Sequence, residues 1–289
     1  MLLAISLFML IGFFYYIFGE ISYKIPNDKN ILIIGDSHTE CSIDDSIFSR
    51  SVNISQSGTP YYYSYIKLKK FMSENKSIDT VLLSIHPGVI GKSIDSVWVY
   101  NSNNITWKVS SVFNLIHKTD FEPFLFNIDF YLAFLKIPIN NIQTLSQLLL
   151  SKQFNYKSTN IGAYNKNLNN NLKENLKKIN NRKMDDGEII NPSLIQREYI
   201  ERIIRFCNDR NTTIILISTP VYNPNRFYNP NIVINYLKDI NLKIKLSDYS
   251  RLPLDDSCFA DISHLNYKGA QMFSSYLNTN GIIITNEIQ

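Results

Sequence analysis

The sequence predicts an α/β fold in which a parallel sheet lies between two layers of helices. Ile31–Ile34 and the centre of Thr212–Ser218 are apolar and rich in β-branched residues, which is typical of parallel strands that are covered on both faces. Amphipathic stretches at helical spacing separate such runs. Because strands alternate with helices, we expect a three-layer α/β/α sandwich with a sheet of about five strands.

The first part of the chain supplies three of these strands. After Ile31–Ile34, a second short strand over 51–54 ends in a loop rich in turn-forming residues. A helix over 61–75, with lysines on the face opposite its apolar residues, leads to a third strand over 78–85. Strand, helix and strand of these lengths predict a parallel crossover.

The pattern changes between about 92 and 187, where we expect a mostly helical insertion. Its first part is strongly aromatic, and residues 165–183 form a tract rich in Asn and Lys that is typical of a solvated helix or loop. An insertion at this position could form a lid or an acceptor groove over a site. A cap that only covers an exposed sheet edge is an equally good interpretation.

The regular pattern returns after Pro192. We expect helices over 194–209, 232–240 and 265–277. The fourth strand, Thr212–Ser218, lies between the first two of these helices, and residues 242–246 alternate like an exposed edge strand. The sequence thus predicts a single α/β domain over 30–289.

Composition excludes several classes of protein. The chain has 289 residues and a net charge of +4 without a concentrated basic stripe, so we expect no nucleic-acid partner. Its three cysteines show no CxxC spacing, and its four histidines fall in no metal-ligand pattern. We therefore expect neither a disulfide framework nor a metal site, and no cofactor.

The chain begins with an apolar run over residues 2–18. Its length is at the lower limit for crossing a bilayer, and no signal-peptide cleavage pattern follows it. We therefore expect a single-pass transmembrane anchor over 1–20 and a polar linker over 21–29. Lys24 and Lys29 follow the run, and the positive-inside rule would place the domain in the cytoplasm.

Candidate catalytic residues lie near the two ends of the chain. Ser37 follows the first strand, and the carboxyl ends of parallel strands are where α/β sheets bind ligands. A serine needs a base to become a nucleophile. Asp261 and His264 are three residues apart, a spacing that puts both on one face of a helical turn.

Gly35-Asp36-Ser37, Gly58 and Asp261-x-x-His264 together resemble the SGNH/GDSL hydrolase superfamily, over most of the chain after about residue 30. More narrowly, the chain is similar to members that act on cell-envelope polymers, including teichoic-acid D-alanine transfer proteins and polysaccharide O-acetyltransferases. The resemblance implies a flavodoxin-like strand order and a catalytic triad of Ser37, His264 and Asp261. It also implies an extracytoplasmic domain, in conflict with the positive-inside rule; we follow the resemblance.

An acyl-transfer mechanism also needs donors for the oxyanion. The backbone N–H groups of Ser37 and Gly58 are the candidates, since a residue without a side chain lets the backbone approach a substrate closely. The family's usual Gly-x-Asn-Asp segment is replaced here by Ser84-Ile85-His86-Pro87. Either His86 or a group of the insertion then replaces that third donor, or the oxyanion hole has only two donors.

Three further residues near these positions have weaker signals. Asp36 is expected to cap the turn rather than to join the triad. His38 is a candidate for substrate binding, and so is Tyr61, the first of three tyrosines at the start of a helix. Such tyrosines are at least as often core residues.

The first functional hypothesis is a serine esterase or O-acyltransferase that acts on a cell-envelope polysaccharide through an acyl-enzyme, with a multi-spanning acyl exporter as a candidate partner. The alternative is a non-catalytic polysaccharide-binding or assembly protein on the same fold. A lipase ranks lower, because the insertion has no clean amphipathic run. The acyl group, the acceptor, and the choice between transfer and hydrolysis do not follow from the sequence.

Overall fold

The computed structural model describes residues 23–112, 161–179, 191–222, 229–240 and 242–288, with Leu10 and isolated positions between 113 and 160. A six-stranded sheet forms its centre, in the order β2-β1-β3-β4-β5-β6. The first five strands pair in parallel, and β6 pairs antiparallel with β5. The strands are β1 (Ile31–Ile34), β2 (Ser51–Asn53), β3 (Thr80–Ser84), β4 (Thr213–Ser218), β5 (Ile244–Asp248) and β6 (Asn286–Ile288).

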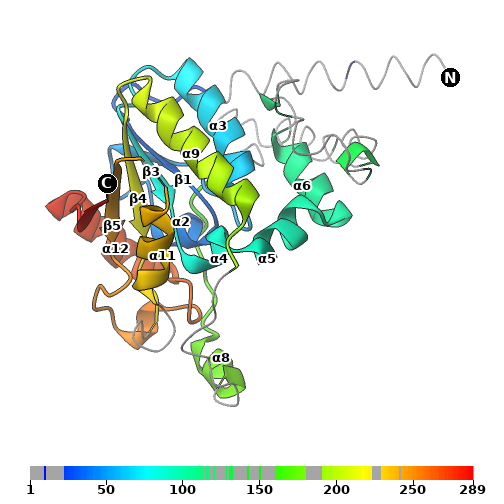
Figure 1. Ribbon diagram of the computed structural model, residues 1–289. Coiled ribbons are helices and arrows are strands. Elements are labelled where there is room, and N and C mark those ends of the chain that lie inside the picture. The colour runs from blue at the N-terminus through cyan, green and yellow to red at the C-terminus, as the bar shows by residue number, and fades with distance from the viewer. Residues whose placement is uncertain are drawn as a thin grey trace.

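Helices cover both faces of this sheet, as the alternation of side chains along the strands requires. Leu32 and Ile34 pack into one apolar core, whereas Ile31 and Ile33 pack into a second core on the other face. Helices α3 (Tyr61–Glu74) and α9 (Leu194–Asn208) pack against each other over the first core, and α2 (Ser37–Ser42) packs with α12 (Tyr267–Asn280) on the second (Figure 1). The predicted parallel α/β sandwich is thus observed. The strand order β2-β1-β3-β4-β5 is the flavodoxin-like order that the resemblance implied.

The edge of the sheet differs from the prediction. Residues 242–246 were expected to form an edge strand, but β5 lies between β4 and the short β6. Three residues with one apolar side chain give too little periodicity for β6 to be identified from sequence. Ile288 of β6 is 7% exposed and packs into the first core, so β6 covers both the edge and the end of that core.

The insertion begins as a chain of short helices beside α3. These are α4 (Pro87–Ile90), α5 (Lys92–Ile94), the π-helical η1 (Asp95–Val99) and α6 (Ser102–Val112). Buried Asp95 accepts hydrogen bonds from Ser193 Oγ and Gln196 Nε2 at 2.5 and 2.7 Å, and so joins η1 to the start of α9. The remaining elements are α8 (Leu172–Ile179), α11 (Pro230–Lys238) and the 3-10 turn η5 (Asp256–Cys258).

An extended segment over 161–171 runs from α2 to α12, where the sequence predicted a solvated helix or loop over 165–183. Its backbone bonds to Glu40 O, Ala260 O and Tyr267 N at 2.8–2.9 Å. Within the predicted range 165–183, only α8 (Leu172–Ile179) forms the expected exposed helix. Alternate asparagines at 165, 167 and 169 are the sequence signal for the extended part, since period two is that of an extended chain.

The predicted single-pass membrane localisation is wrong for the described part of the chain. Among the helices of that part, none combines the length and the apolar character needed to cross a bilayer. The expected anchor over 1–20 lies outside the described residues apart from Leu10.

Candidate active site

Ser37 is placed by the end of β1 and the start of α2. Asp36 is the N-cap of α2, and its side chain accepts a hydrogen bond from the N–H of His38 at 3.2 Å. A Cβ on Gly35 would lie 2.2 Å from the Cβ of Ser84 on β3, so only glycine fits at this turn. Ser37 therefore becomes the first helical residue, and its own N–H has no partner within the helix.

His264 and Asp261 reach Ser37 from a loop just before α12. His264 Nε2 lies 2.8 Å from Ser37 Oγ, across 227 positions of sequence. His264 Nδ1 lies 3.0 Å from both carboxylate oxygens of Asp261. The three predicted triad residues are thus brought together in the order hydroxyl, imidazole, carboxylate.

The local reason for the Asp261–His264 pairing differs from the expected helical turn. Asp261 Oδ1 accepts hydrogen bonds from the backbone N–H groups of Ser263 and His264 at 2.7 and 2.9 Å, which makes an Asx turn. The helix begins only at Tyr267, after its N-cap Asn266. The turn directs the imidazole back onto the carboxylate.

The environment sets the charge of this pair. Burial would lower the pKa of His264, but the hydrogen bond and the charge of Asp261 outweigh it, so that the pKa is raised above its usual value of 6.5. Burial would raise the pKa of Asp261, but the bonds and charge of His264 lower it. Asp261 is therefore ionised at neutral pH and stabilises an imidazolium.

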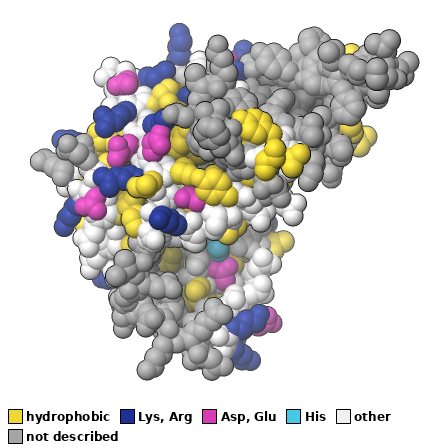
Figure 2. Space-filling view, turned by 45° about the vertical axis from the view of Figure 1, so that its right-hand side comes forward, with side chains coloured by type: hydrophobic (Ala, Val, Ile, Leu, Met, Phe, Trp, Pro, Cys, Tyr) yellow, Lys and Arg dark blue, Asp and Glu magenta, His cyan; other side chains and the backbone are white. Residues whose placement is uncertain are grey.

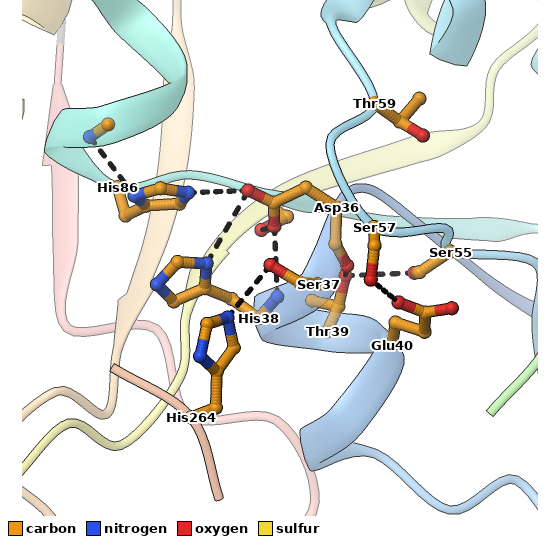
Figure 3. A network of polar contacts seen from close by, with 12 residues as sticks. Asp36, Ser37, His38, Thr39, Glu40, Ser55, Ser57, Thr59, His86 and His264 are labelled. Carbon is orange, nitrogen blue, oxygen red and sulfur yellow. Dashed lines mark hydrogen bonds and ion pairs between the residues drawn. The ribbon is translucent and has the colours of Figure 1, made fainter. Parts of the chain in front are cut away.

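A second carboxylate network lies behind Ser37 (Figure 3). His86 Nε2 lies 2.5 Å from Asp36 Oδ2, and Ser84 Oγ donates to Asp36 Oδ1 at 2.9 Å. His38 Nδ1 is 3.4 Å from the same Oδ2, and its ring lies 3.6 Å from that of His86, centre to centre. Burial would raise the pKa of Asp36, but His86 and His38 hold it well below its usual value. Asp36 is thus an ionised cap, and no sequence pattern predicted its bond to His86.

Asp36, His38 and His86 are close enough to share a metal ion, since one ligand atom from each lies within 4.8 Å of the others. The proton positions favour hydrogen bonding instead. Gly88 N–H donates to His86 Nδ1 at 3.0 Å, so the proton of a neutral His86 is on Nε2 and points at Asp36. A metal-binding Nε2 would need the opposite tautomer, with Nδ1–H as the donor.

The bonds of His86 to Asp36 and Gly88 do not fit its predicted role as a third oxyanion donor. Both of its ring nitrogens are engaged, Nε2 with Asp36 and Nδ1 with Gly88, so the residue offers no free N–H to an oxyanion. It fixes Asp36 instead. His38 does line the cavity at Ser37, and burial lowers the pKa of His38 to about 4, which leaves it neutral.

Tyr61 is not a substrate-binding residue in this structure. It is 1% exposed, and its hydroxyl donates to Ser84 O at 3.0 Å beneath the site. Tyr62 and Tyr63 are buried as well. The start of α3 faces the sheet, which explains why these tyrosines belong to the core.

Gly58 lies in the loop after β2 with φ +59°. Within the described chain no group accepts a hydrogen bond from the N–H of Gly58 or from that of Ser37, and both residues line the same cavity. A Cβ at Gly58 would lie 2.2 Å from the Trp98 ring. Two backbone N–H donors without an acceptor in the described chain therefore belong to residues that line one cavity with the Ser37 hydroxyl, which makes them candidates for oxyanion binding.

The cavity has a volume of about 630 Å³ and opens at the surface. Figure 2 shows a hollow where a histidine and an acidic side chain reach the surface side by side, and His264 and Asp261 have side chains that are 25% and 32% exposed. Two parts of the insertion form walls of the cavity: Trp98 of η1, and the asparagines 165, 167 and 169 of the extended segment. Sequence reasoning had assigned no site residue to either part.

Comparisons with known proteins reveal only distant similarity. A protein-family model matches residues 149–286, less than half of the chain, which include Asp261 and His264 but not Ser37. A search of curated proteins found no significant match.

Three solved structures are similar over most of their length. A Streptococcus pneumonia protein described provisionally as a platelet activating factor is 15% identical, with a TM-score of 0.44, and 97% of this chain and 99% of that chain are covered. A GDSL-like lipase from Bacteroides thetaiotaomicron is 10% identical, with a TM-score of 0.40 and coverage of 94% and 97%. A variant of an acetyl xylan esterase from Geobacillus stearothermophilus is 13% identical, with a TM-score of 0.34 and coverage of 92% and 99%. These similarities are too weak to assign a function, so the assignment depends on the geometry of the site.

Proposed function

We propose that this protein is a serine-dependent enzyme that breaks or transfers acyl esters, with Ser37 as nucleophile, His264 as base and Asp261 as the residue that orients it. The observation that carries the proposal is the pair of contacts at His264, 2.8 Å to Ser37 Oγ and 3.0 Å to Asp261. These contacts support the proposal, because they match the geometry of a Ser-His-Asp triad.

In this mechanism Ser37 Oγ attacks the ester carbonyl while His264 Nε2 takes its proton. Asp261 accepts the Nδ1–H bond and stabilises the imidazolium that forms. The N–H groups of Ser37 and Gly58 bind the oxyanion, and His264 then protonates the leaving alcohol. Water or a second hydroxyl attacks the resulting acyl-enzyme, which gives hydrolysis or transfer.

The walls of the cavity support a hydroxyl-rich substrate, such as an O-acylated carbohydrate. An indole and several amide side chains surround the nucleophile: Trp98, Asn165, Asn167 and Asn169. An aromatic face can stack on the apolar face of a sugar ring, and nearby polar side chains can hydrogen-bond to its hydroxyl groups. We propose acylated sugars as the substrate class; a polysaccharide-binding protein without activity is the alternative that the next experiment addresses.

The test is labelling of the full chain with a fluorophosphonate probe, together with hydrolysis of p-nitrophenyl acetate. The wild type is expected to react at Ser37, and Ser37→Ala to lose labelling and at least about 10³-fold in kcat. Ser263→Ala is the matched control, since Ser263 lines the same cavity without contacting His264 Nε2. Equal labelling of wild type and Ser37→Ala, or no labelling of either, would exclude the catalytic proposal and leave the binding alternative.

A further inference from the structure

Two lysines are fully buried beside the Gly58 loop, and the proposed mechanism uses neither. Lys67 of α3 and Lys108 of α6 are both 0% exposed. Both Nζ atoms lie near Gln56 Oε1, at 3.1 and 3.3 Å. A lysine is almost never fully buried unless it has specific partners, so their contacts indicate what they do.

Lys108 binds the loop at several points. Its Nζ donates to Ser57 O at 2.5 Å and to Thr59 Oγ1 at 2.7 Å. With Gln56 Oε1 these make three acceptors, which match the three N–H donors of an ammonium. The rings of Trp98 and Trp107 lie 5.2 and 4.3 Å from the same Nζ and form cation–π contacts with it.

The contact with Ser57 O has a direct consequence for Gly58. Ser57 C=O and Gly58 N–H belong to one planar trans peptide, so they point in opposite directions. A lysine that binds the carbonyl therefore turns the N–H the opposite way, and Gly58 itself lines the cavity at Ser37. Gly58 has a left-handed φ of +59°, and this backbone conformation accompanies the orientation of the Ser57–Gly58 peptide.

We infer that Lys108, carried by the insertion, is a positioning residue that fixes the Ser57–Gly58 peptide so that its N–H serves as an oxyanion donor. This inference depends on the proposed function. The remaining contacts of the loop support it: Ser57 Oγ donates to Glu40 of α2 (Figure 3), and Trp98 packs directly on Gly58. Contacts from α2 and from the insertion thus both hold the Ser57–Gly58 segment.

Lys67 provides an internal comparison. It is equally buried and binds the same Gln56 oxygen, but it does not contact the Ser57–Gly58 peptide. Burial lowers the pKa of Lys67 to about 7, and burial with the charge of Lys67 lowers that of Lys108 well below its usual value. A neutral amine keeps two N–H donors, so an uncharged Lys108 can still bind Ser57 O and one further acceptor, but not all three.

The test compares Lys108→Met with Lys67→Met in the full chain, using p-nitrophenyl acetate. For Lys108→Met we expect kcat to fall by roughly tenfold to a hundredfold with KM within about threefold, because misplacing an oxyanion donor affects the transition state selectively. Affinity for an arylboronic acid, whose adduct with serine is tetrahedral and anionic, should fall by a similar factor. Lys67→Met should change kcat by less than about threefold.

A spectroscopic measurement tests the same peptide without using activity. Ser57–Gly58 is the only Ser-Gly pair in the sequence, so labelling with [carbonyl-13C]serine and [15N]glycine gives one correlated signal. We expect this signal to move in Lys108→Met, with the carbonyl upfield as a hydrogen bond is lost, and to stay in place in Lys67→Met. If Lys108→Met does not fold, Lys108→Gln, which keeps an N–H donor, should show an intermediate kcat and shift.

Each outcome bears on the inference. Equal kcat values or equal shifts in the two methionine variants would overturn the positioning role of Lys108 while Ser37 labelling still supported the triad. A shift in Lys108→Met without loss of kcat would show that the peptide is fixed but is not an oxyanion donor. An enzyme in which Ser37 does not label would exclude both proposals.

Discussion

At the residue scale, two carboxylates on either side of Ser37 have different tasks. Asp261 faces the cavity and is a third exposed, whereas Asp36 is buried and accepts from two side chains and a backbone N–H. The sequence could separate these roles, because Asp36 precedes a helix and Asp261 lies three residues before a histidine. It could not reveal the bond between Asp36 and His86, since these partners are 50 residues apart, each just after a different strand, and leave no local pattern.

The pH dependence of activity should report on Asp261. His264 must be neutral to accept the serine proton, and its pKa is raised by Asp261, so kcat/KM should fall on the acid side with an apparent pKa above 6.5. Asp261→Asn removes the charge that favours the imidazolium, so this limb should move to lower pH. The same change lowers kcat by roughly 10²- to 10⁴-fold: the N–H groups of Ser263 and His264 retain the amide oxygen, so the amide NH2 faces Nδ1 and favours the wrong imidazole tautomer. An acid limb that stays in place would contradict the assignment.

Buried lysines illustrate a limit of reasoning from residue types. Lysines in the helix over 61–75 were expected on a solvated face, and Lys67 is instead fully buried beside Lys108. Sequence patterns treat lysine as a surface residue because its burial requires several acceptors in the right places. Those acceptors come from the loop after β2, which only the folded chain brings near.

At the element scale, the extended segment 161–171 joins the two halves of the site. Its backbone bonds to Glu40 of α2 and to Ala260 and Tyr267 at the Asp261–His264 loop. Its direction depends on Gly162, which has φ +127° and whose added Cβ would lie 2.4 Å from Ile54 O. The sequence predicted an insertion near the site but could not predict that this part of it borders the nucleophile.

Gly162→Ala should therefore affect both stability and activity. We expect a loss of at least about 2 kcal/mol in the free energy of unfolding, from backbone strain and overlap, and a fall in kcat of about tenfold as the segment moves. Gly281→Ala is the matched control, with φ +70° but no atom within 4 Å of the added Cβ. It should cost about 1–3 kcal/mol through strain alone and leave kcat unchanged. Urea denaturation and p-nitrophenyl acetate kinetics distinguish the two variants; equal kcat values would show that the segment does not position the site.

At the scale of the whole molecule, the sheet brings the site together. In the order β2-β1-β3-β4-β5, β2 lies on one side of β1, whereas β3 and the later strands lie on the other. A crevice forms at such a switch point, beyond the carboxyl ends of β1 and β3. Ser37 follows β1, and His86 follows β3. The sandwich, its parallel strands and the end of the sheet that carries the site could be predicted, because they depend on periodicity and strand polarity. The closing strand β6 could not, because it is short and is determined by tertiary pairing.

The contribution of the edge strand β6 to the first apolar core can be tested by mutation. Ile288→Ala should lower the free energy of unfolding by about 2–5 kcal/mol, since Ile288 is buried in the core that β6 covers. Glu287→Ala is the control on the same strand, because Glu287 is exposed and should change stability by less than about 0.5 kcal/mol. Thermal and urea denaturation measure both. Similar values for the two variants would mean that β6 is peripheral to the fold.

The distance of 227 positions between Ser37 and His264 has a consequence during biosynthesis. The hydroxyl leaves the ribosome early, whereas its imidazole partner is translated only after nearly all of the sheet. A nascent polypeptide therefore carries an inert serine that cannot attack cellular esters. Reactivity arises only when the late-made segment docks, which makes the final stage of chain assembly the step that switches on the proposed chemistry.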